Sequence, residues 1–432
     1  MTRDSRRAGL PHDSRWTALT HGPRRAELVL HTVTLVNALG NGLFTVAGTL
    51  FFVQVLDMSP IRMGVGLAVA AALGLAVSVP VTRALDGRSL RAAYSALLVV
   101  QAVAMALLPT ARSFGVFVAV LALGAAGQKS ARAVNNALIG QVAGDRRAEV
   151  RAISRSVNNV GTAGGALLSS AAVVSGTDRA YELLVYADAS TFLLAAALVP
   201  AVHAAGRLAT AGRGRYASAL RDPRYVTVTL ADGVMCLEYF VITLVLPLWV
   251  VEHTAAPRAV VPALFALNML LVALLQIRIS RRAGTIPAAA RSVRVSGAVF
   301  LVSLAALLAA GHVAVVPAVV LLVAGVGLHT FGEVYHAAGA SELSYGLAPE
   351  GRMTEYQGVF GLGMGVAEIV APYALVVACL ESGWAGWAGL AVLLAATGAT
   401  VPFLASWPPG RIPDAPGRGQ STESDSTEVL AP

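Results

Sequence analysis

The sequence is poor in charged residues. Asp, Glu, Lys and Arg make up only 13% of its 432 residues, whereas 56% are hydrophobic. A soluble domain carries about 25% charged residues, so this chain has too few charges to cover a surface that faces water. The shortage argues against a soluble globular protein and predicts an integral membrane protein.

Lysine and cysteine are almost missing. Lys129 is the only lysine, and the two cysteines, Cys236 and Cys379, both lie in apolar runs. Two isolated cysteines suggest neither a disulfide framework nor a metal site, and no metal spacing links them to His31, His329 or His336. We therefore expect no metal and no cofactor.

Several functional signatures are also lacking. The N-terminal 27 residues are Arg-rich and polar and lack the apolar core and cleavage site of a signal peptide. No contiguous basic face on a soluble domain indicates nucleic-acid binding, and no glycine-rich phosphate loop indicates ATP-driven transport.

A lipid-modifying membrane enzyme is the alternative from a different class, but it would need a catalytic cluster of paired acids and a His at a membrane face. No such cluster is evident, so we expect no catalytic residues and no enzyme.

Long runs of Leu, Val, Ala and Gly dominate what is present, and the mean hydropathy is +0.68. A helix needs about 20 apolar residues to cross a bilayer, and the runs lack the alternation of a membrane β-barrel. The sequence therefore predicts an all-α membrane protein with twelve transmembrane helices. The expected spans are 28–55, 61–82, 92–110, 114–140, 151–175, 181–203, 226–251, 259–280, 292–310, 314–341, 354–378 and 384–405.

Polar segments divide these spans into two groups of six. We expect a cytoplasmic tail at 1–27, a six-helix bundle at 28–203, a cytoplasmic linker at 204–225, a second bundle at 226–406, and a disordered cytoplasmic tail at 407–432. Arginines favour the cytoplasmic side of a membrane. With both termini inside, the outer loops hold only Arg62, Arg112, Arg179 and Arg258. This asymmetry predicts a multi-pass plasma-membrane protein with both termini in the cytoplasm.

The two halves repeat each other. Thr34-Leu35-Val36-Asn37 matches Thr229-Leu230-Ala231-Asp232, and the basic segment 83–88 corresponds to the basic segment 278–284. Two parallel repeats of six helices are a transporter architecture, in which the substrate site lies between the halves near the membrane midplane.

With this span pattern and internal repeat, the chain resembles the major facilitator superfamily over about residues 25–406, and in particular its bacterial drug-efflux-type members. The family's loop between helices 2 and 3 reads Gly-x-x-x-Asp-Arg-x-Gly-Arg-Arg. Gly87 and Arg88 fit this loop, whereas the acidic Asp86 is displaced toward the glycine. The resemblance implies that the loop of Asp86, Gly87 and Arg88 stabilises one access state. It also implies a basic residue in helix 4, for which Arg132 and Lys129 are the candidates.

Lys129 and Arg132 are three residues apart on one helix face. A cation at the centre of a membrane helix costs about 2.5–3.5 kcal/mol, so the two should face a water-filled cavity or a counter-charge. The alternative is that their long side chains reach the lipid headgroups.

The same shift along the chain takes Lys129 to Glu333, Arg132 to His336 and Gly161 to Gly365. If the repeat holds, a cation and a carboxylate face each other across the central cavity, where protonation of the carboxylate would couple transport to protons. A static structural ion pair is the alternative.

Other polar residues inside the spans are weaker candidates. Glu238 is a second candidate for binding protons or substrate, and Asn37 and Asn41 are candidates to line the cavity. Asp188 and Glu368 are further acids within spans, and Asp232 lies close enough to a helix end to be interfacial.

Four glycines have Gly-x-x-x-Gly spacing, which permits close helix packing. They are Gly161, Gly165, Gly361 and Gly365. We expect packing within one chain rather than dimerisation, and hence a monomer.

The expected function is secondary active transport of a small organic solute across the lipid bilayer by alternating access. Proton-coupled export of an amphipathic drug or metabolite is favoured, and a proton-coupled nutrient importer is the alternative.

Overall fold

The computed structural model describes residues 13–143, 147–202, 219–349 and 352–408. Every regular element in these ranges is a helix, so the prediction of an all-α membrane protein is confirmed. Most of the expected linker at 204–225 and of the C-terminal tail lies outside the described residues. Below, the N-terminal half means residues 13–202 and the C-terminal half means residues 219–408.

The N-terminal half starts earlier than expected. Its first helix begins at Asp13 rather than at residue 28, and its apolar, span-like part runs from Arg24 to Thr45. Apolarity alone defined the expected boundary, but a helix continues into polar sequence where it leaves the membrane. The helices of this half are α1 (Asp13–Gln54), α2 (Pro60–Ala84), α3 (Leu90–Leu107), α4 (Phe114–Ala143), α5 (Arg147–Leu168), α6 (Ser170–Ser175) and α7 (Asp178–Leu198).

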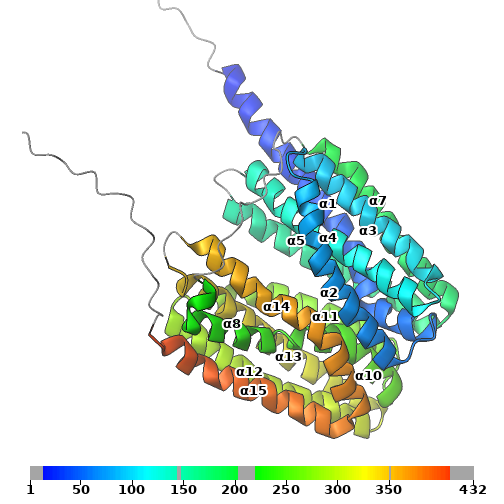
Figure 1. Cartoon of the computed structure of the whole chain (residues 1–432). Coiled ribbons are helices and arrows are strands. Elements are labelled where there is room, and N and C mark those ends of the chain that lie inside the picture. Colours follow the sequence, from blue (N-terminus) through cyan, green and yellow to red (C-terminus); the bar gives the residue numbers. More distant parts are fainter. Residues whose placement is uncertain (1–12, 144–146, 203–218, 350–351, 409–432) are drawn as a thin grey trace, which may run out of the picture.

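The C-terminal half contains two π-helical turns. The expected span 226–251 is one interrupted helix, and the last two helices are likewise joined by a π-helical turn. In order, the elements are α8 (Pro223–Met235), α9 (Glu238–Phe240), the π turn η5 (Val241–Val245), α10 (Leu246–His253), α11 (Val260–Ser280), α12 (Ile286–Ala309), α13 (Val315–Gly346), α14 (Met353–Leu375), the π turn η7 (Val376–Glu381) and α15 (Gly383–Ser406). Figure 1 shows the blue-to-cyan half and the green-to-red half side by side.

Eleven helices among the described residues are long and apolar enough to cross a membrane, rather than the twelve expected. The exception is the pair α5 and α6, because α5 carries Arg155, Asn158 and Asn159 and the chain is interrupted at Ser169. Apolar side chains such as Val316, 74% exposed, and Leu274, 66% exposed, lie on the outside of the molecule. An apolar exterior of this kind suits a lipid environment.

Short polar caps set where several helices begin. The Ser59 hydroxyl accepts a hydrogen bond from the Arg62 N–H at 3.3 Å at the start of α2. The Asp222 carboxylate accepts hydrogen bonds from the N–H groups of Arg224 and Tyr225 at the start of α8. Each cap precedes a proline, which suits the first helical turn because that turn needs no N–H from it.

Glycines allow the closest helix contacts in the N-terminal half. A Cβ atom at Gly165 of α5 would overlap the Leu39 carbonyl oxygen of α1, and one at Gly42 of α1 would overlap the Thr162 carbonyl oxygen of α5. A Cβ atom at Gly161 would stand 2.8 Å from the Ala38 side chain. The backbones of α1 and α5 therefore touch directly.

In the C-terminal half the close contact lies at a different glycine from those expected. Gly363 of α14 packs against Gly233 of α8, with a Cβ at Gly363 only 2.8 Å from the Thr229 carbonyl oxygen. Apart from the adjoining part of α14 itself, no described atom lies within 4 Å of the Cβ position at Gly361, and at Gly365 the nearest is Leu75 at 3.8 Å. The prediction that Gly361 and Gly365 pack closely is therefore wrong, because the side of α14 that meets α8 carries Gly363.

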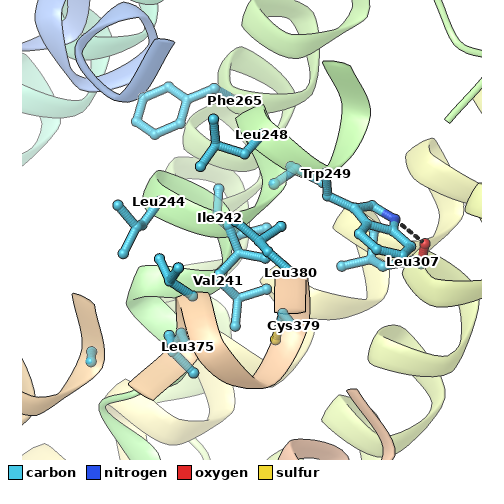
Figure 2. Close-up of a cluster of buried hydrophobic side chains, with 14 of the residues drawn as sticks. Val241, Ile242, Leu244, Leu248, Trp249, Phe265, Leu307, Leu375, Cys379 and Leu380 are labelled. Atoms are coloured by element: carbon cyan, nitrogen blue, oxygen red, sulfur yellow. Dashed lines mark hydrogen bonds between the residues drawn. The ribbon is translucent and has the colours of Figure 1, made fainter. Parts of the chain in front are cut away.

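A buried apolar cluster holds the interrupted helices together. Figure 2 shows Val241, Ile242 and Leu244 of η5 beside Leu375 and Leu380 of the α14–η7 segment. The indole N–H of Trp249 donates to the Leu307 carbonyl oxygen at 2.9 Å, which links α10 to α12. The π turns are thus enclosed by packed side chains.

The two halves meet through α2 with α14 and through α5 with α11. A Cβ at Gly64 of α2 would stand 2.6 Å from the Pro372 carbonyl oxygen of α14, and the Thr49 hydroxyl donates to the Thr243 carbonyl oxygen at 3.4 Å. Gly64 and Thr49 lie near the helix ends remote from the start of α1 and the end of α15. Figure 1 shows the halves diverging toward the end where α1 begins and α15 ends.

The glycine contacts predict opposite effects for the same substitution at two positions. Gly165→Ala should destabilise the protein by about 1–3 kcal/mol, because its methyl group overlaps the backbone of α1. Gly361→Ala should be neutral or stabilising by up to about 1 kcal/mol, because alanine favours helix and the space is open. Thermal unfolding of the detergent-solubilised variants measures both. Equal melting temperatures for the two variants would contradict the packing described for Gly165.

Candidate functional site

A cavity of about 560 Å³ lies between the two halves. Residues of α1, α2, α3, α4 and α7 line it on one side, and residues of α9, η5, α11, α13 and α14 line it on the other. Small-molecule sites in proteins occupy about 300–1,000 Å³, so the cavity is large enough for an organic solute.

The cavity wall combines apolar and polar side chains. Aromatic and methionine side chains form much of the apolar wall: Phe44, Phe52, Phe192, Tyr239, Phe240, Met105, Met269 and Met364. Uncharged polar groups interrupt it: Asn41, Gln101, Gln128 and Asn268. Such a wall suits a molecule that has both an apolar body and polar groups.

Four charged residues line the same cavity: Lys129, Arg132, Glu333 and Glu368. Lys129 and Arg132 therefore both line this cavity, as the first of the two alternatives for them requires. The Lys129 ammonium group forms a salt bridge with the Glu368 carboxylate, and the two side chains are 20% and 23% exposed. This ion pair joins α4 of one half to α14 of the other.

The ion-pair partner of Lys129 differs from the one that the internal repeat suggests. Glu333 lies on the wall of the same cavity, as expected, but the direct salt bridge goes to Glu368. The repeat relates α4 to α13 by position within each half. The repeat does not predict which helix of the other half brings a carboxylate within reach of the ammonium group. In the structure that helix is α14.

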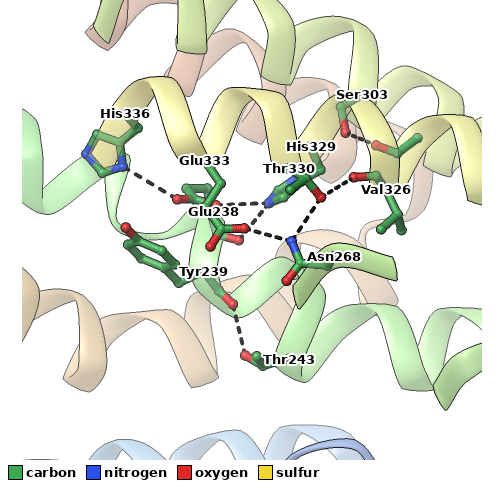
Figure 3. Close-up of polar contacts among 11 residues, drawn as sticks. Glu238, Tyr239, Thr243, Asn268, Ser303, Val326, His329, Thr330, Glu333 and His336 are labelled. Atoms are coloured by element: carbon green, nitrogen blue, oxygen red, sulfur yellow. Dashed lines mark hydrogen bonds and ion pairs between the residues drawn. The ribbon is translucent and has the colours of Figure 1, made fainter. Parts of the chain in front are cut away.

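Glu333 is held by neighbours on α11 and α13. The Asn268 amide donates to the Glu333 carboxylate at 2.8 Å and to the Thr330 hydroxyl at 3.0 Å (Figure 3). Among the described residues no ion pair is found for Glu333. It is therefore a carboxylate at a cavity wall whose hydrogen-bond donor is a neutral amide.

Glycines on one side of α13 explain this placement. A Cβ at Gly325, Gly332 or Gly339 would stand 2.5–2.7 Å from Leu307, Phe300 or the Ala289 backbone, all in α12. These glycines recur every seven residues and so share one face of the helix. With that face held against α12, other faces of α13 carry Glu333 to the cavity and His336 to α8.

A buried polar cluster lies behind the cavity wall. Figure 3 shows Glu238 between two histidines of α13. His329 Nε2 is 3.0 Å from Glu238 Oε2, and His336 Nδ1 is 3.5 Å from Glu238 Oε1. His336 Nε2 is 3.0 Å from Asp232 Oδ1. Cluster residues Glu238, His329 and His336 are at most 1% exposed.

His336 and Glu238, two of the candidates for proton or substrate binding, do not line the central cavity. They contact each other inside the C-terminal half, and their role in proton or substrate binding stays a prediction. Asp232, for which an interfacial position was open, is only 9% exposed and belongs to the same cluster. The spacing of residues along one helix predicts which side chains share a face of that helix. It does not predict this cluster, because the cluster forms only where α8 packs against α13.

The predicted asparagine pair lines a polar pocket of about 170 Å³ that adjoins the central cavity. Asn37 and Asn41 both border this pocket, whereas only Asn41 of the two also lines the central cavity. Asn41 and Arg132 border both. Within the described chain, the buried Oδ1 atoms of Asn37 and Asn135 have no hydrogen-bond partner.

Asp86, Gly87 and Arg88 form the turn between α2 and α3. Gly87 has a φ of +72°, which glycine adopts more readily than other residues. Its N–H donates to the Asp86 carboxylate at 3.1 Å. The backbone geometry of the turn therefore accounts for an Asp-Gly pair at this place. The role of the turn in gating stays a prediction.

One group of side chains has the donor types of a metal site, although the sequence predicted none. Asp232, Cys236 and His336 offer ligand atoms that lie within 4.8 Å of one another. Their positions in the sequence show no metal spacing, because the histidine comes from a helix about one hundred residues further along the chain.

Comparisons with known proteins agree with this architecture. A family model described as Major Facilitator Superfamily matches residues 30–372. A search of curated protein sequences finds no significant match.

Solved structures of transporters share the fold at low sequence identity. A mutant of the nucleoside transporter NupG has a TM-score of 0.72 and 12% identity, over 88% of this chain and 98% of its own. A POT family transporter in complex with a thioalcohol-conjugated peptide has a TM-score of 0.69 and 12% identity, over 88% and 96%. A bacterial homologue of the human lysosomal transporter Spinster, in an inward-facing and unoccupied conformation, has a TM-score of 0.65 and 14% identity, over 89% and 96%.

The fold, the cavity between the halves and the matched family model agree, and they indicate a membrane transporter. The chain belongs to the Major Facilitator Superfamily.

Proposed function

We propose that the protein is a secondary active transporter that exports a small amphipathic organic solute in exchange for protons, by alternating access. The observation that carries this proposal is the central cavity, which both halves line and which holds Glu333 and the Lys129–Glu368 ion pair. We further propose a monomer in the plasma membrane with both termini in the cytoplasm.

The cavity wall supports an amphipathic solute. Aromatic rings and methionine side chains give apolar contact that adapts to different shapes. Amide groups such as those of Gln101 and Gln128 offer hydrogen bonds to a polar end of the solute. A nutrient with many hydroxyl groups would leave most of the apolar wall without a favourable contact.

Glu333 is the proposed proton-binding group. An ionised carboxylate within a membrane is costly unless a charge or several hydrogen bonds compensate it. Glu333 has the Asn268 amide as a donor. Taking up a proton removes its charge, and the cavity gives the proton a path to whichever side of the membrane is open.

The Lys129–Glu368 ion pair is the proposed link between solute binding and movement of the halves. It connects α4 to α14, so it must break when the two halves rotate apart at that level. A charged group of the solute, or a proton on Glu368, would compete for this pair and would lower the cost of separating it.

The state of the molecule follows from the proposed orientation. The halves touch near Gly64 and Pro372, remote from the start of α1 and the end of α15. With the termini in the cytoplasm, this contact closes the outer side and leaves the cavity accessible from inside. Export rests on the resemblance to drug-efflux-type members, and a proton-coupled importer would share the same cavity.

Removing the charge of Glu333 should abolish proton coupling. In proteoliposomes with an imposed proton gradient, Glu333→Gln should lower gradient-driven flux of an amphipathic dye such as ethidium at least tenfold, because the amide cannot exchange a proton. Glu342→Gln, on the same helix but outside the cavity lining, is the matched control and should behave as wild type.

A panel of organic cations, anions and neutral amphiphiles widens this test, and reversing the gradient distinguishes export from import. The proposal fails if no compound shows gradient-dependent flux and Glu333→Gln matches wild type.

Exchanging the charges of the cross-half ion pair should preserve part of its role. Lys129→Glu and Glu368→Lys alone each place like charges together and should lower dye flux at least tenfold. The double variant restores opposite charges and should recover more flux than either single variant, measured in the same proteoliposomes. A double variant that is folded but no more active than the single variants would show that the pairing itself is not required.

A further inference from the structure

The interruption of the helix after α8 brings three possible metal ligands together. α8 ends at Met235, Cys236 caps it by donating its backbone N–H to the Asp232 carbonyl oxygen, and the chain resumes at Glu238 in α9. Asp232 and Cys236 are four residues apart and therefore share a face of the helix. His336 reaches this face from α13.

The distances suit a small metal ion. His336 Nε2 is 3.0 Å from Asp232 Oδ1, Cys236 Sγ is 3.7 Å from Asp232 Oδ2, and the ligand atoms of all three lie within 4.8 Å of one another. Ligand atoms about 2.0–2.3 Å from a tetrahedral Zn²⁺ are about 3.3–3.8 Å apart. Small side-chain shifts would bring the three to this spacing.

We propose that Asp232, Cys236 and His336 form a binding site for a divalent transition-metal ion, with Zn²⁺ the best fit. The site lies inside the C-terminal half, and none of its three ligands lines the central cavity. It is therefore independent of the transport reaction proposed above and can be tested apart from it.

The charges and donor types favour a borderline-soft dication. The Asp232 carboxylate and the Cys236 thiolate together carry two negative charges, so a dication bound to them and to a neutral imidazole forms a group of ion and three ligands with no net charge. A neutral site is the least costly in a membrane interior. Sulfur and imidazole nitrogen favour zinc-like ions over Mg²⁺ or Ca²⁺, which prefer oxygen ligands.

Glu238 supports the histidine from behind. Its Oε1 lies 3.5 Å from His336 Nδ1, while Nε2 of the same ring faces Asp232. Metal-binding histidines commonly donate the other ring N–H to a carboxylate, which fixes the ring orientation and its tautomer. His329 in turn lies 3.0 Å from the second oxygen of Glu238.

The three protein ligands leave one tetrahedral position open. The Asp232 side chain, 10% exposed, is the most accessible part of the site, whereas His336 is 2% exposed. A water molecule on this side would complete the coordination. A bound ion would also tie α8 to α13 directly at the point where the helix is interrupted.

Cobalt spectroscopy on the purified full-length protein tests the site. Co²⁺ bound through Cys236 should give a near-ultraviolet thiolate-to-cobalt absorption band, and Zn²⁺ should displace it. Cys236→Ser should lose the band and bind Co²⁺ at least tenfold more weakly, and His336→Gln should weaken binding by a similar factor. Cys379→Ser is the matched control because Cys379 is the other buried free cysteine.

A second measurement needs no variant and so does not depend on whether one folds. Zn²⁺ should slow alkylation of Cys236 at least tenfold in the wild-type protein and leave Cys379 unchanged, as mapped by mass spectrometry. Wild type without a thiolate band, a band that survives in Cys236→Ser, or equal protection of the two cysteines would overturn the proposal.

Discussion

The cost of placing a charge inside a membrane governs how the polar groups of this protein are arranged. Lys129, the only lysine in the chain, finds its counter-charge on a helix of the other half. The Asp232 and Glu238 carboxylates find polar partners in the imidazole rings of His336 and His329 of α13. Since each of these groups would be costly alone, each contact also fixes how the helices that carry it are placed.

The two kinds of charged contact have different consequences for movement. The Glu238 cluster lies within the C-terminal half and is buried, so it stabilises the packing of α8 against α13. The Lys129–Glu368 pair crosses between the halves beside a cavity, so it can separate in exchange for contacts with water or solute. The alternating-access mechanism proposed above requires both a half that moves as a unit and a contact between halves that can separate.

Helix packing in lipid depends on close contact, because the apolar exterior provides little hydrophobic drive for association. Gly165 against α1 and Gly363 against α8 meet this need, since any side chain at either place would push the helices apart. The π turns η5 and η7 have the opposite effect, because they interrupt regular packing and must be enclosed by the cluster around Trp249. The π turn η5 follows shortly after Asp232 and Cys236, two of the three residues of the proposed metal site.

The amino-acid sequence by itself determined the environment and the secondary structure of the protein. Few charges, long apolar runs and the spacing of polar turns predict membrane helices, because these properties are local to each segment. The same reasoning placed Lys129 and Glu333 at the cavity. It wrongly predicted close helix packing at Gly361, and it counted α5 as a membrane span although that helix is too polar. Only the tertiary structure decided which groups meet. Lys129 pairs with Glu368 rather than Glu333, and Asp232, Cys236 and His336 converge, because these contacts depend on how separate helices are turned and packed.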